Sequence, residues 1–170
     1  MSRWRGRRLA GLALAAFLAV AGAGAIAMAS DRGPGWIVVR DPGGVELARA
    51  SLPPSAEFSM RYRNSVYRSI AEERFRASGD HLEIVELRAQ ELAVLEEYYT
   101  AVGAVEHPAS SLRWRIAVDR PPVALPLRVQ ATALGERTLV TADAEIALWR
   151  LVAGRDDTVV VLTIEGRGEQ

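Results

Sequence analysis

The chain has 170 residues, with 21 basic residues that are all arginine, 21 acidic residues and no cysteine, and its formal net charge at pH 7 is zero. This length corresponds to about one domain, and the lack of cysteine excludes disulfides, thiolate metal sites and cysteine nucleophiles. Four arginines lie within residues 1–8 and no acidic residue precedes Asp31, so the rest is slightly acidic, which argues against nucleic acid as a partner because nucleic-acid binding requires a clustered basic face.

Residues 1–29 have the layout of a secretory signal peptide. An arginine-rich start is followed by an apolar run of about 20 residues that ends at an A-x-A cleavage site, Ala27-Met28-Ala29. This pattern predicts Ser30 as the N-terminus of the mature protein. Because the run is long enough to cross a bilayer, an uncleaved inner-membrane anchor is the alternative. In both cases the arginine-rich end stays in the cytoplasm, so the remainder is expected to be periplasmic or exported.

The remainder divides into a linker at residues 30–35, a single β-rich domain at residues 36–166 and a short tail at residues 167–170. Glycine and proline mark the linker. At the start of the domain, residues 36–40 and 45–52 are β-prone runs on either side of an Asp-Pro-Gly-Gly turn. We therefore expect these two runs to form a hairpin.

Residues 57–99 hold the densest mixture of charged and aromatic side chains. Strands are expected at residues 57–64, 71–77 and 81–89, and short turns should join them as a meander. In the first strand apolar residues alternate with polar ones, which is typical of a strand with one buried and one solvent-facing side. The alternating residues are Phe58, Met60 and Tyr62 on one side and Ser59, Arg61 and Arg63 on the other. Residues 91–100 fit both helical and strand spacing, and we expect a short helical or irregular crossover there.

The last third of the chain contains further short elements. Residues 112–118 alternate between apolar and polar, which predicts a half-buried strand. Residues 127–134 and 137–142 flank a Gly-Glu pair and are expected to form a hairpin. An aspartate at position 143 can cap a helix over residues 144–152. Residues 158–165 are apolar on both faces, which favours a central strand.

About nine short strands and one or two short helices predict a mainly β fold, either an antiparallel sandwich or a partly open barrel. The core is expected to consist of the apolar residues on one face of each strand. These residues are Ile37, Val39, Phe58, Met60, Tyr62, Phe75, Ile84, Trp114, Ile116, Val118, Val129, Leu139, Val161 and Ile164.

A short motif follows the first strand of the meander, with Asn64-Ser65-Val66 at its start and Glu73 seven residues after the valine. This order resembles the domain-of-unknown-function family numbered eighteen-fifty, in which Asn64 stands where histidine is usual. Members are small exported β-proteins commonly found beside TRAP transporters of the TAXI type. The resemblance extends over roughly residues 36–165. It implies a periplasmic, transport-associated role with a membrane transporter subunit as partner.

Two interpretations of Asn64-Ser65 stay open. The pair either forms a polar corner whose side chains satisfy backbone groups at a strand end, or it contacts a ligand. A histidine at position 64 would supply a base or metal ligand near neutral pH, and asparagine does not. This difference counts against catalysis.

Charged side chains of neighbouring strands are expected to form a solvent-facing ion-pair surface, because cross-strand partners face each other every second residue. The residues concerned are Arg61, Arg63, Arg74, Arg76, Glu72, Glu73 and Glu83. The alternative is that one arginine is left over and binds a small carboxylate ligand through a bidentate contact. Tyr98 and Tyr99 either line a pocket or form the rim of the apolar core. The candidate ligand-binding residues are therefore Arg61, Arg63, Asn64, Ser65, Glu73, Tyr98 and Tyr99.

The sequence contains no complete catalytic set. The two histidines, His81 and His107, belong to no HExxH motif, and neither a GxSxG motif nor a P-loop is present. We therefore expect no cofactor and no metal, and a non-catalytic accessory or small-ligand-binding protein of a solute-uptake system. The rival hypothesis is a periplasmic hydrolase or isomerase that uses Ser65 and Glu73, which requires a carboxyl group of raised pKa beside a cleft.

Overall fold

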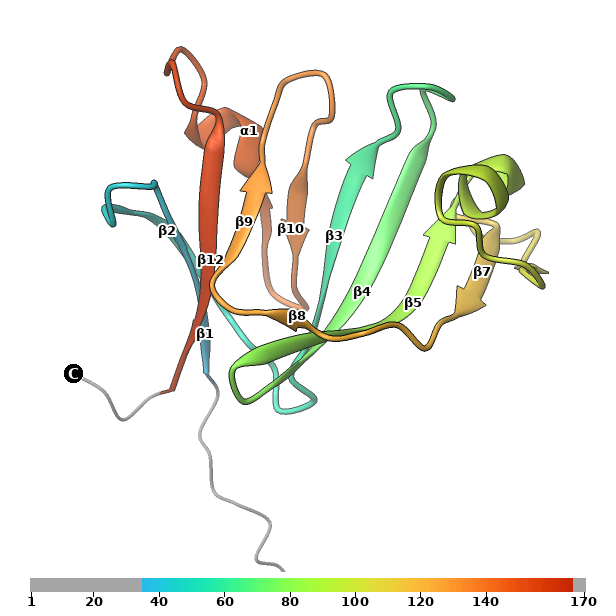
Figure 1. Ribbon diagram of the computed structural model, residues 1–170, viewed down its shortest axis with the longest axis horizontal. Coiled ribbons are helices and arrows are strands. Elements are labelled where there is room, and N and C mark those ends of the chain that lie inside the picture. The colour runs from blue at the N-terminus through green and yellow to red at the C-terminus, as the bar shows by residue number, and fades with distance from the viewer. Residues whose placement is uncertain (1–34, 167–170) are drawn as a thin grey trace, which may run out of the picture. The chain divides into compact units, whose positions relative to one another are not determined.

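The computed structural model describes residues 35–166, so the predicted signal peptide or anchor, most of the linker and the tail lie outside the described residues. Within this range the chain forms twelve strands and two short helical elements (Figure 1). Their bounds are β1 (Trp36–Arg40), β2 (Glu46–Ser51), β3 (Glu57–Arg63), β4 (Ile70–Ser78), β5 (His81–Ala89), η1 (Val94–Tyr98), β6 (Val105–Glu106), β7 (Trp114–Ala117), β8 (Val123–Ala124), β9 (Leu127–Gln130), β10 (Thr138–Val140), β11 (Glu145–Ala147), α1 (Leu148–Leu151) and β12 (Val159–Glu165).

The strands form two antiparallel sheets that pack as a sandwich (Figure 1). The four-stranded sheet has the order β2-β1-β12-β9. The eight-stranded sheet has the order β11-β10-β3-β4-β5-β7-β6, and β8 pairs with one end of β5. The sheets are not closed into a barrel. The predicted mainly β, antiparallel fold is confirmed.

The hairpins that were predicted from short turns between neighbouring strands are formed. β1 pairs with β2, and β3, β4 and β5 pair in chain order as a meander. In the first turn, the Asp41 carboxylate accepts a hydrogen bond from the Val45 N–H at 3.0 Å. Gly44 in this turn has a φ of 91°, a left-handed conformation that glycine adopts without the steric cost of a Cβ. The expected crossover after β5 is also present, as the short helical element η1.

The predicted hairpin of residues 127–134 with residues 137–142 is wrong. β9 pairs with β12 in the four-stranded sheet, whereas β10 pairs with β3 and β11 in the eight-stranded sheet. The loop between β9 and β10 therefore crosses from one sheet to the other. A tight turn does form at Glu136, but Val129 lies opposite Val160 and Leu139 lies opposite Met60. Apolar pairing with distant strands thus outweighs the local hairpin pattern.

The predicted helix over residues 144–152 is shorter than expected. Its first half forms β11, which pairs with β10, and α1 begins after Ala147. Asp143 does not cap the helix, because α1 begins four residues later than expected, with Ala147 at its N-cap; Asp143 Oδ2 instead accepts a hydrogen bond from the Ser51 hydroxyl at 2.8 Å. β6, β8 and β11 have two or three residues each, which is too short for a periodic pattern. For this reason the sequence predicted about nine strands rather than twelve.

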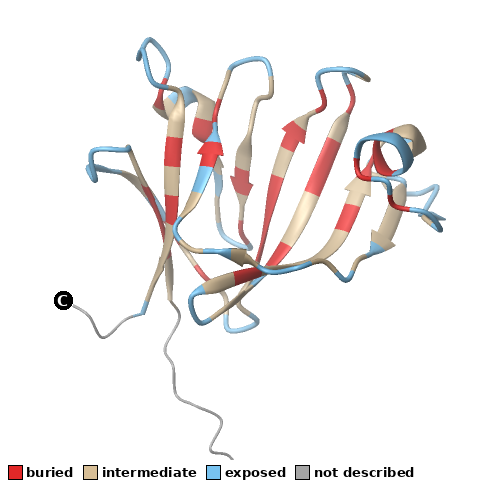
Figure 2. Cartoon of the chain, viewed as in Figure 1, coloured by how far each residue is buried: buried red, intermediate tan, exposed pale blue. Residues whose placement is uncertain are grey.

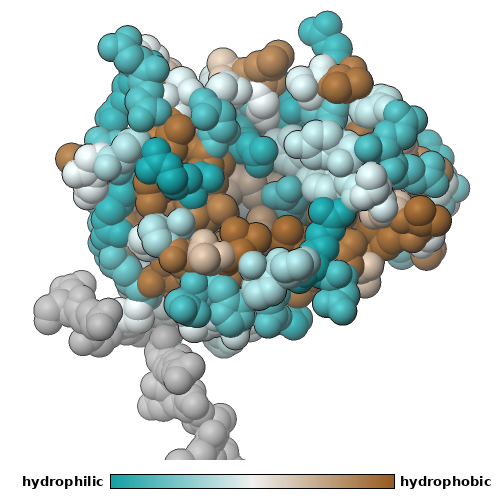
Figure 3. Space-filling view, viewed as in Figure 1, coloured by the Kyte–Doolittle hydropathy of each residue, from teal (hydrophilic) through white to brown (hydrophobic). Residues whose placement is uncertain are grey.

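Side chains from both sheets form the first of two apolar clusters, between the layers (Figure 2). The rings of Phe58 on β3 and Phe75 on β4 stack at a centroid distance of 5.4 Å. The largest fully buried side chains of this first cluster are Ile37, Met60, Leu82, Leu139, Leu148 and Leu162. Figure 3 shows apolar surface in the middle of the same view, near β8 and β9. The partly buried Val123, Leu125 and Leu127 of this region pack against the first cluster.

The second cluster lies on the inner face of the eight-stranded sheet, where η1 packs against β5. Val94 and Leu95 of η1 are fully buried there against Leu87 of β5. Its buried members are Tyr62, Ala71, Leu87, Ala89, Val94, Leu95, Tyr99 and Ala101.

Most of the predicted core is buried, with an exception on β12. Val160 and Leu162 are buried and Val161 is only half-buried, because alternate residues of a strand face opposite sides. The prediction that Val161 faces the core is therefore wrong. Five other predicted core residues are half-buried at the edges of the clusters, namely Ile84, Trp114, Ile116, Val118 and Ile164.

Charged side chains cover the outer face of the eight-stranded sheet. Arg74 lies between Glu57, at 2.8 Å, and Glu86, at 2.9 Å. Arg88 contacts Glu86 at 2.6 Å and Glu72 at 3.4 Å. Burial alone would raise the pKa of Glu86, but the hydrogen bonds from Arg88 and Arg74 outweigh burial and lower it. An ion-pair surface is thus formed on these strands, but with Glu57 and Glu86 as the partners of Arg74, and the expected member Glu73 lies on the opposite, inner face.

The first prediction concerns the second cluster. Leu87→Ala should lower the free energy of unfolding by about 2 to 5 kcal/mol, because it removes a fully buried side chain and leaves a cavity. Urea unfolding followed by circular dichroism measures this change. Val66→Ala is the matched control, since Val66 is 74% exposed, and its effect should stay within about 0.5 kcal/mol. Equal effects of the two changes would contradict the described packing.

Candidate functional site

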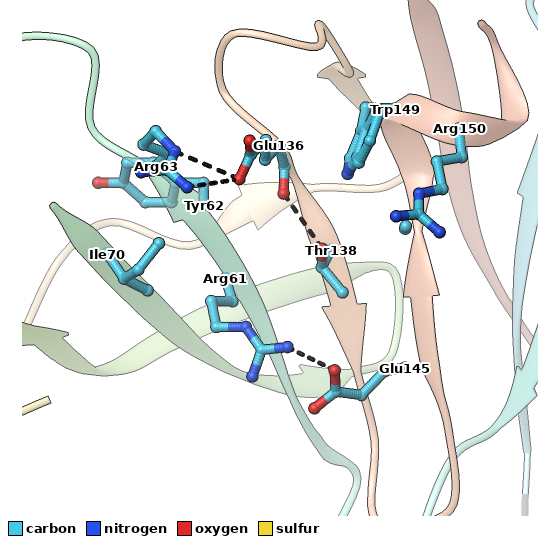
Figure 4. A pocket seen from close by; sticks show the side chains of 10 residues that line it. Arg61, Tyr62, Arg63, Ile70, Glu136, Thr138, Glu145, Trp149 and Arg150 are labelled. Atoms are coloured by element: carbon cyan, nitrogen blue, oxygen red, sulfur yellow. Dashed lines mark hydrogen bonds and ion pairs between the residues drawn. The ribbon is translucent and has the colours of Figure 1, made fainter. Parts of the chain in front are cut away.

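An open hollow of about 330 Å³ lies on the outer face of the eight-stranded sheet, at β3, β10 and β11 (Figure 4). The register places Arg61 of β3 beside Thr138 of β10, which in turn lies beside Ala147 of β11. Cross-strand neighbours point to the same side of a sheet, so these three residues share one face. The sheet therefore supplies a rigid floor for the hollow.

Both sequence-predicted arginines of this hollow are paired. Arg61 contacts Glu145 at 2.5 Å, and Arg63 contacts Glu136 at 3.0 Å (Figure 4). These partners differ from the expected glutamates of β4 and β5. The reason is that β10 and β11 extend the sheet beyond β3, which brings carboxylates from a distant part of the chain to its outer face.

Arg150 is the arginine without a carboxylate partner in the hollow. Its guanidinium carbon lies 4.8 Å from the ring centroid of Trp149, and no carboxylate of residues 35–166 lies within ion-pair distance of it. The lining holds three arginines and two glutamates, so it carries one excess positive charge. The lining residues are Arg61, Tyr62, Arg63, Ile70, Glu136, Thr138, Glu145, Ala147, Trp149 and Arg150.

Asn64 forms the corner between β3 and β4. Its side chain is buried, and its Oδ1 accepts hydrogen bonds from the backbone N–H groups of Val66 and Tyr67, both at 3.0 Å. Its own backbone N–H donates to the Ser69 carbonyl at 2.8 Å. Asn64 thus satisfies backbone groups at a strand end, the first of the two interpretations above. Ser65 is exposed in the same turn and lines neither hollow of this sheet.

Glu73 lies on the inner face of the sheet, between Met60 of β3 and Leu87 of β5. Its Oε1 accepts a hydrogen bond from the Tyr99 hydroxyl at 2.6 Å, and the Tyr62 hydroxyl lies 2.5 Å from that of Tyr99. Because Tyr99 has one proton and gives it to Glu73, Tyr62 must be the donor to Tyr99. The three side chains form a continuous hydrogen-bonded chain, which we call the Tyr-Tyr-Glu chain.

Burial raises the pKa of Tyr62 and of Tyr99, and the negative charge of Glu73 raises that of Tyr99 further. Both hydroxyls therefore stay protonated and act as donors at neutral pH. Two arginines flank this chain. The guanidinium carbon of Arg137 lies 4.9 Å from the Tyr62 ring centroid, and that of Arg120 lies 5.4 Å from the Tyr99 ring centroid.

The structure separates the sequence-predicted candidates into three groups. Arg61 and Arg63 meet in the outer hollow, and Asn64 and Ser65 form the β3–β4 turn. Glu73 and Tyr99 meet on the inner face, because alternate residues of a strand face opposite sides. These groups do not converge on one site. Tyr98 is 58% exposed, and its ring packs edge-on against Tyr99 at 5.0 Å.

Sequence reasoning missed the other half of the outer hollow. Glu136, Thr138, Glu145, Trp149 and Arg150 come from segments for which a hairpin and a longer helix were expected. Their polar side chains gave no signal, because only the pairing of β10 with β3 makes them neighbours of Arg61. The adjacent Trp149-Arg150 pair was the one local hint of an aromatic and a cation together.

Two other kinds of site concern the same residues: a catalytic pair of Ser65 and Glu73, and a cluster of metal-ligating side chains. Ser65 lies in the β3–β4 turn. Glu73 lies three residues beyond Ile70, the first residue of β4, which corresponds to about 10 Å at strand spacing, and its side chain points to the inner face. Within residues 35–166 no three side chains of the metal-ligating types histidine, aspartate and glutamate come together. The arrangement in the outer hollow is instead suited to holding an anion, with guanidinium groups, a hydroxyl and an indole ring on rigid elements.

The second prediction concerns the β3–β4 corner. Asn64→Ala should lower the free energy of unfolding by about 1 to 3 kcal/mol, because two backbone N–H groups lose their acceptor. Urea unfolding measures the loss, and Asn64→Asp, which keeps the acceptor oxygen, should recover most of it. Ser65→Ala is the matched control and should change stability by less than about 0.5 kcal/mol. If Asn64→Ala did not change the free energy of unfolding, the buried amide would have no structural role.

The third prediction concerns the Tyr-Tyr-Glu chain at alkaline pH. Tyrosine in the unfolded chain ionises at about pH 10, whereas the buried pair stays protonated to higher pH. The folded state then binds more protons, so the free energy of unfolding should fall above pH 10 by up to about 1.4 kcal/mol per pH unit for each tyrosine. Tyr99→Phe should be less stable than wild type at pH 7, because Glu73 loses its donor, and should show a shallower decline between pH 10 and 12.

Urea unfolding at a series of pH values gives both quantities for Tyr99→Phe. Tyr98→Phe is the control, because this side chain is largely exposed, and it should keep the wild-type slope. An unchanged alkaline slope in Tyr99→Phe would contradict the burial of its hydroxyl.

Comparison with known proteins adds no further constraint on the site. No protein-family model, curated protein or solved structure matches the chain. The resemblance to the domain-of-unknown-function family numbered eighteen-fifty stays a prediction that rests mainly on residues 64–75. Among the described residues, no helix combines the length and the apolar character needed to cross a membrane.

Proposed function

We propose that this protein is a non-catalytic binding protein that holds a small carboxylate in the outer hollow, and that it serves as an exported accessory of a TRAP-type solute-uptake system. The proposal rests mainly on the position of Arg150. This arginine lies against Trp149 at the hollow and has no carboxylate partner among the described residues. The transport context comes from the resemblance of residues 64–75. A membrane transporter subunit is then the partner that receives or senses the ligand.

The chemistry of the hollow favours a carboxylate ligand. A guanidinium group presents paired N–H donors that match the two oxygens of a carboxylate, and such bidentate contacts are stronger than neutral hydrogen bonds. Contact with the Trp149 ring restricts the orientation of the Arg150 guanidinium. Glu136 and Glu145 already occupy Arg63 and Arg61, so Arg150 carries the excess positive charge.

The size of the hollow favours a small ligand. Its volume of about 330 Å³ is near the lower end of the range of about 300 to 1,000 Å³ for small-molecule sites. Glu136 and Glu145 also exclude ligands with several negative charges, because each added carboxylate would approach one of them. A monocarboxylate metabolite with few carbon atoms, with or without an ammonium group, fits both constraints.

The geometry supports binding rather than catalysis by Ser65 and Glu73. The exposed hydroxyl of Ser65 lies at the turn, and Glu73 accepts a hydrogen bond from Tyr99 on the other side of the sheet. A general base must lie within hydrogen-bond reach of the group that it activates.

The fourth prediction tests this proposal by thermal unfolding with small carboxylates and amino acids. A ligand at 100 times its dissociation constant should stabilise the wild type by roughly 2.7 kcal/mol. Arg150→Gln should abolish this shift, and Arg61→Gln should reduce it, because the Glu145 carboxylate then lacks its partner and repels the anion. Arg128→Gln is the matched control, since Arg128 is an exposed arginine on β9 outside the hollow, and it should keep the full shift.

Two outcomes would count against the proposal. If no carboxylate stabilises the wild type, the protein is not a carboxylate-binding protein. If a shift persists unchanged in Arg150→Gln, the ligand binds elsewhere and the assigned hollow is wrong.

A further inference from the structure

A second and larger hollow, of about 800 Å³, lies farther along the outer face of the eight-stranded sheet. Its floor is formed by β4, β5 and β7, and the segment of residues 102–107 forms one wall. It shares no lining residue with the first hollow. We propose that it binds an amphiphilic monocarboxylate, whose carboxylate contacts Arg115 and whose alkyl or aryl body lies against valine side chains.

The charged side chains of this second hollow form an ion-pair network that leaves one arginine, Arg115, without a carboxylate partner among the described residues. Glu57 is contacted by Arg74 at 2.8 Å and by Arg76 at 2.7 Å, and Glu86 is contacted by Arg74 at 2.9 Å. Arg115 has no carboxylate within ion-pair distance among the described residues. Three arginines and two glutamates line the hollow, so one positive charge is uncompensated.

Arg115 also has an unused donor. Its Nη2 donates to the Ser110 hydroxyl at 2.9 Å, which fixes one end of the guanidinium. Its Nε is buried and has no hydrogen-bond partner in the described part of the chain. Buried N–H groups in proteins are almost always paired, and an unpaired one costs free energy. This nitrogen has almost no accessible surface, so a carboxylate in the hollow would contact the η nitrogens of Arg115 rather than Nε.

An irregularity in β5 supplies part of the apolar surface. The register between β4 and β5 shifts between Arg74 and Phe75, so Glu86 lies opposite Arg74 whereas Ile84 lies opposite Phe75. Val85 is the extra residue of this bulge, and both Val85 and Glu86 line the outer hollow. A bulge redirects a side chain in this way where a strict alternation would turn it inward.

The wall of the hollow adds further apolar surface. Val102 is 85% exposed and Val105 is 61% exposed, and both line the hollow. Two exposed valines beside Val85 and Ala117 would contact the body of an amphiphile, and the removal of this surface from water favours binding. The uncompensated cation at one position and the valines around it therefore select an anion with an apolar body.

Isothermal titration of the purified protein with butyrate, hexanoate and octanoate tests the proposal. Affinity should rise with chain length by up to about fourfold per added CH2 group. Arg115→Gln should weaken octanoate binding at least tenfold. Ala117→Glu places a carboxylate at an exposed position in the hollow and should weaken binding similarly, whereas Ala117→Gln, which is matched in size, should not. Near-ultraviolet circular dichroism confirms that each variant is folded.

The outcomes separate this proposal from the proposed function. Octanoate binding that is lost in Arg150→Gln but retained in Arg115→Gln and in Ala117→Glu belongs to the first hollow and overturns the second site. Affinity that does not depend on chain length, or no octanoate binding by the wild type, also overturns it. Loss of short-carboxylate stabilisation in Arg150→Gln, with octanoate binding retained, supports two separate sites.

Discussion

A hydrogen-bonded chain that ends at the Glu73 carboxylate, on the core-facing side of β4, links β3, β4 and the residue after η1. Glu73 is half-buried between the buried Met60 and Leu87, so an unpaired charge there would lose part of its hydration. Tyr99 provides the hydrogen bond that offsets this cost, and Tyr62 continues the chain. Tyr62 and Tyr99 belong to the second apolar cluster and Met60 belongs to the first, so the chain lies where the two clusters meet. Tyr99 directly follows η1, so the chain connects that helical element to β3 and β4.

The outer face of the same sheet follows a different rule, in which nearly every charge has a partner. Arginines and glutamates alternate across β3, β4 and β5, and exposed pairs of this kind contribute little to stability individually. These ion pairs matter more for ligand binding than for stability. Each paired arginine is already occupied, so the capacity to bind an anion lies with arginines that have no carboxylate nearby. Arg150 and Arg115 are the two that line hollows on this face.

Both hollows depend on secondary-structure elements at the margins of the sheet. β10, β11 and α1 bring Thr138, Glu145 and Arg150 to β3, and the segment after η1 brings Val102 and Val105 to β5 and β7. Rigid strands form the floor in each case, and shorter segments form the walls. This arrangement is common in binding proteins, where a stable scaffold positions residues of the connecting segments. It explains why a sheet with a regular ion-pair surface can still carry two hollows, each lined by an arginine that has no carboxylate partner among the described residues.

The sequence by itself determined the features that depend on neighbouring residues. Alternation and turn residues specified the β1–β2 hairpin, the β3–β4–β5 meander and the central position of β12, and a polar corner at Asn64-Ser65 was one of the two interpretations that the sequence left open. Only the tertiary structure decided where β9 and β10 pair, which glutamates meet Arg61 and Arg63, and that Glu73 and Tyr99 form one chain. Arg61 and Glu145 are 84 positions apart, and no local pattern encodes such a contact. Long-range pairing is instead selected by the apolar surface that whole strands bury together, and the charged side chains on the opposite face are then placed by the register of those strands.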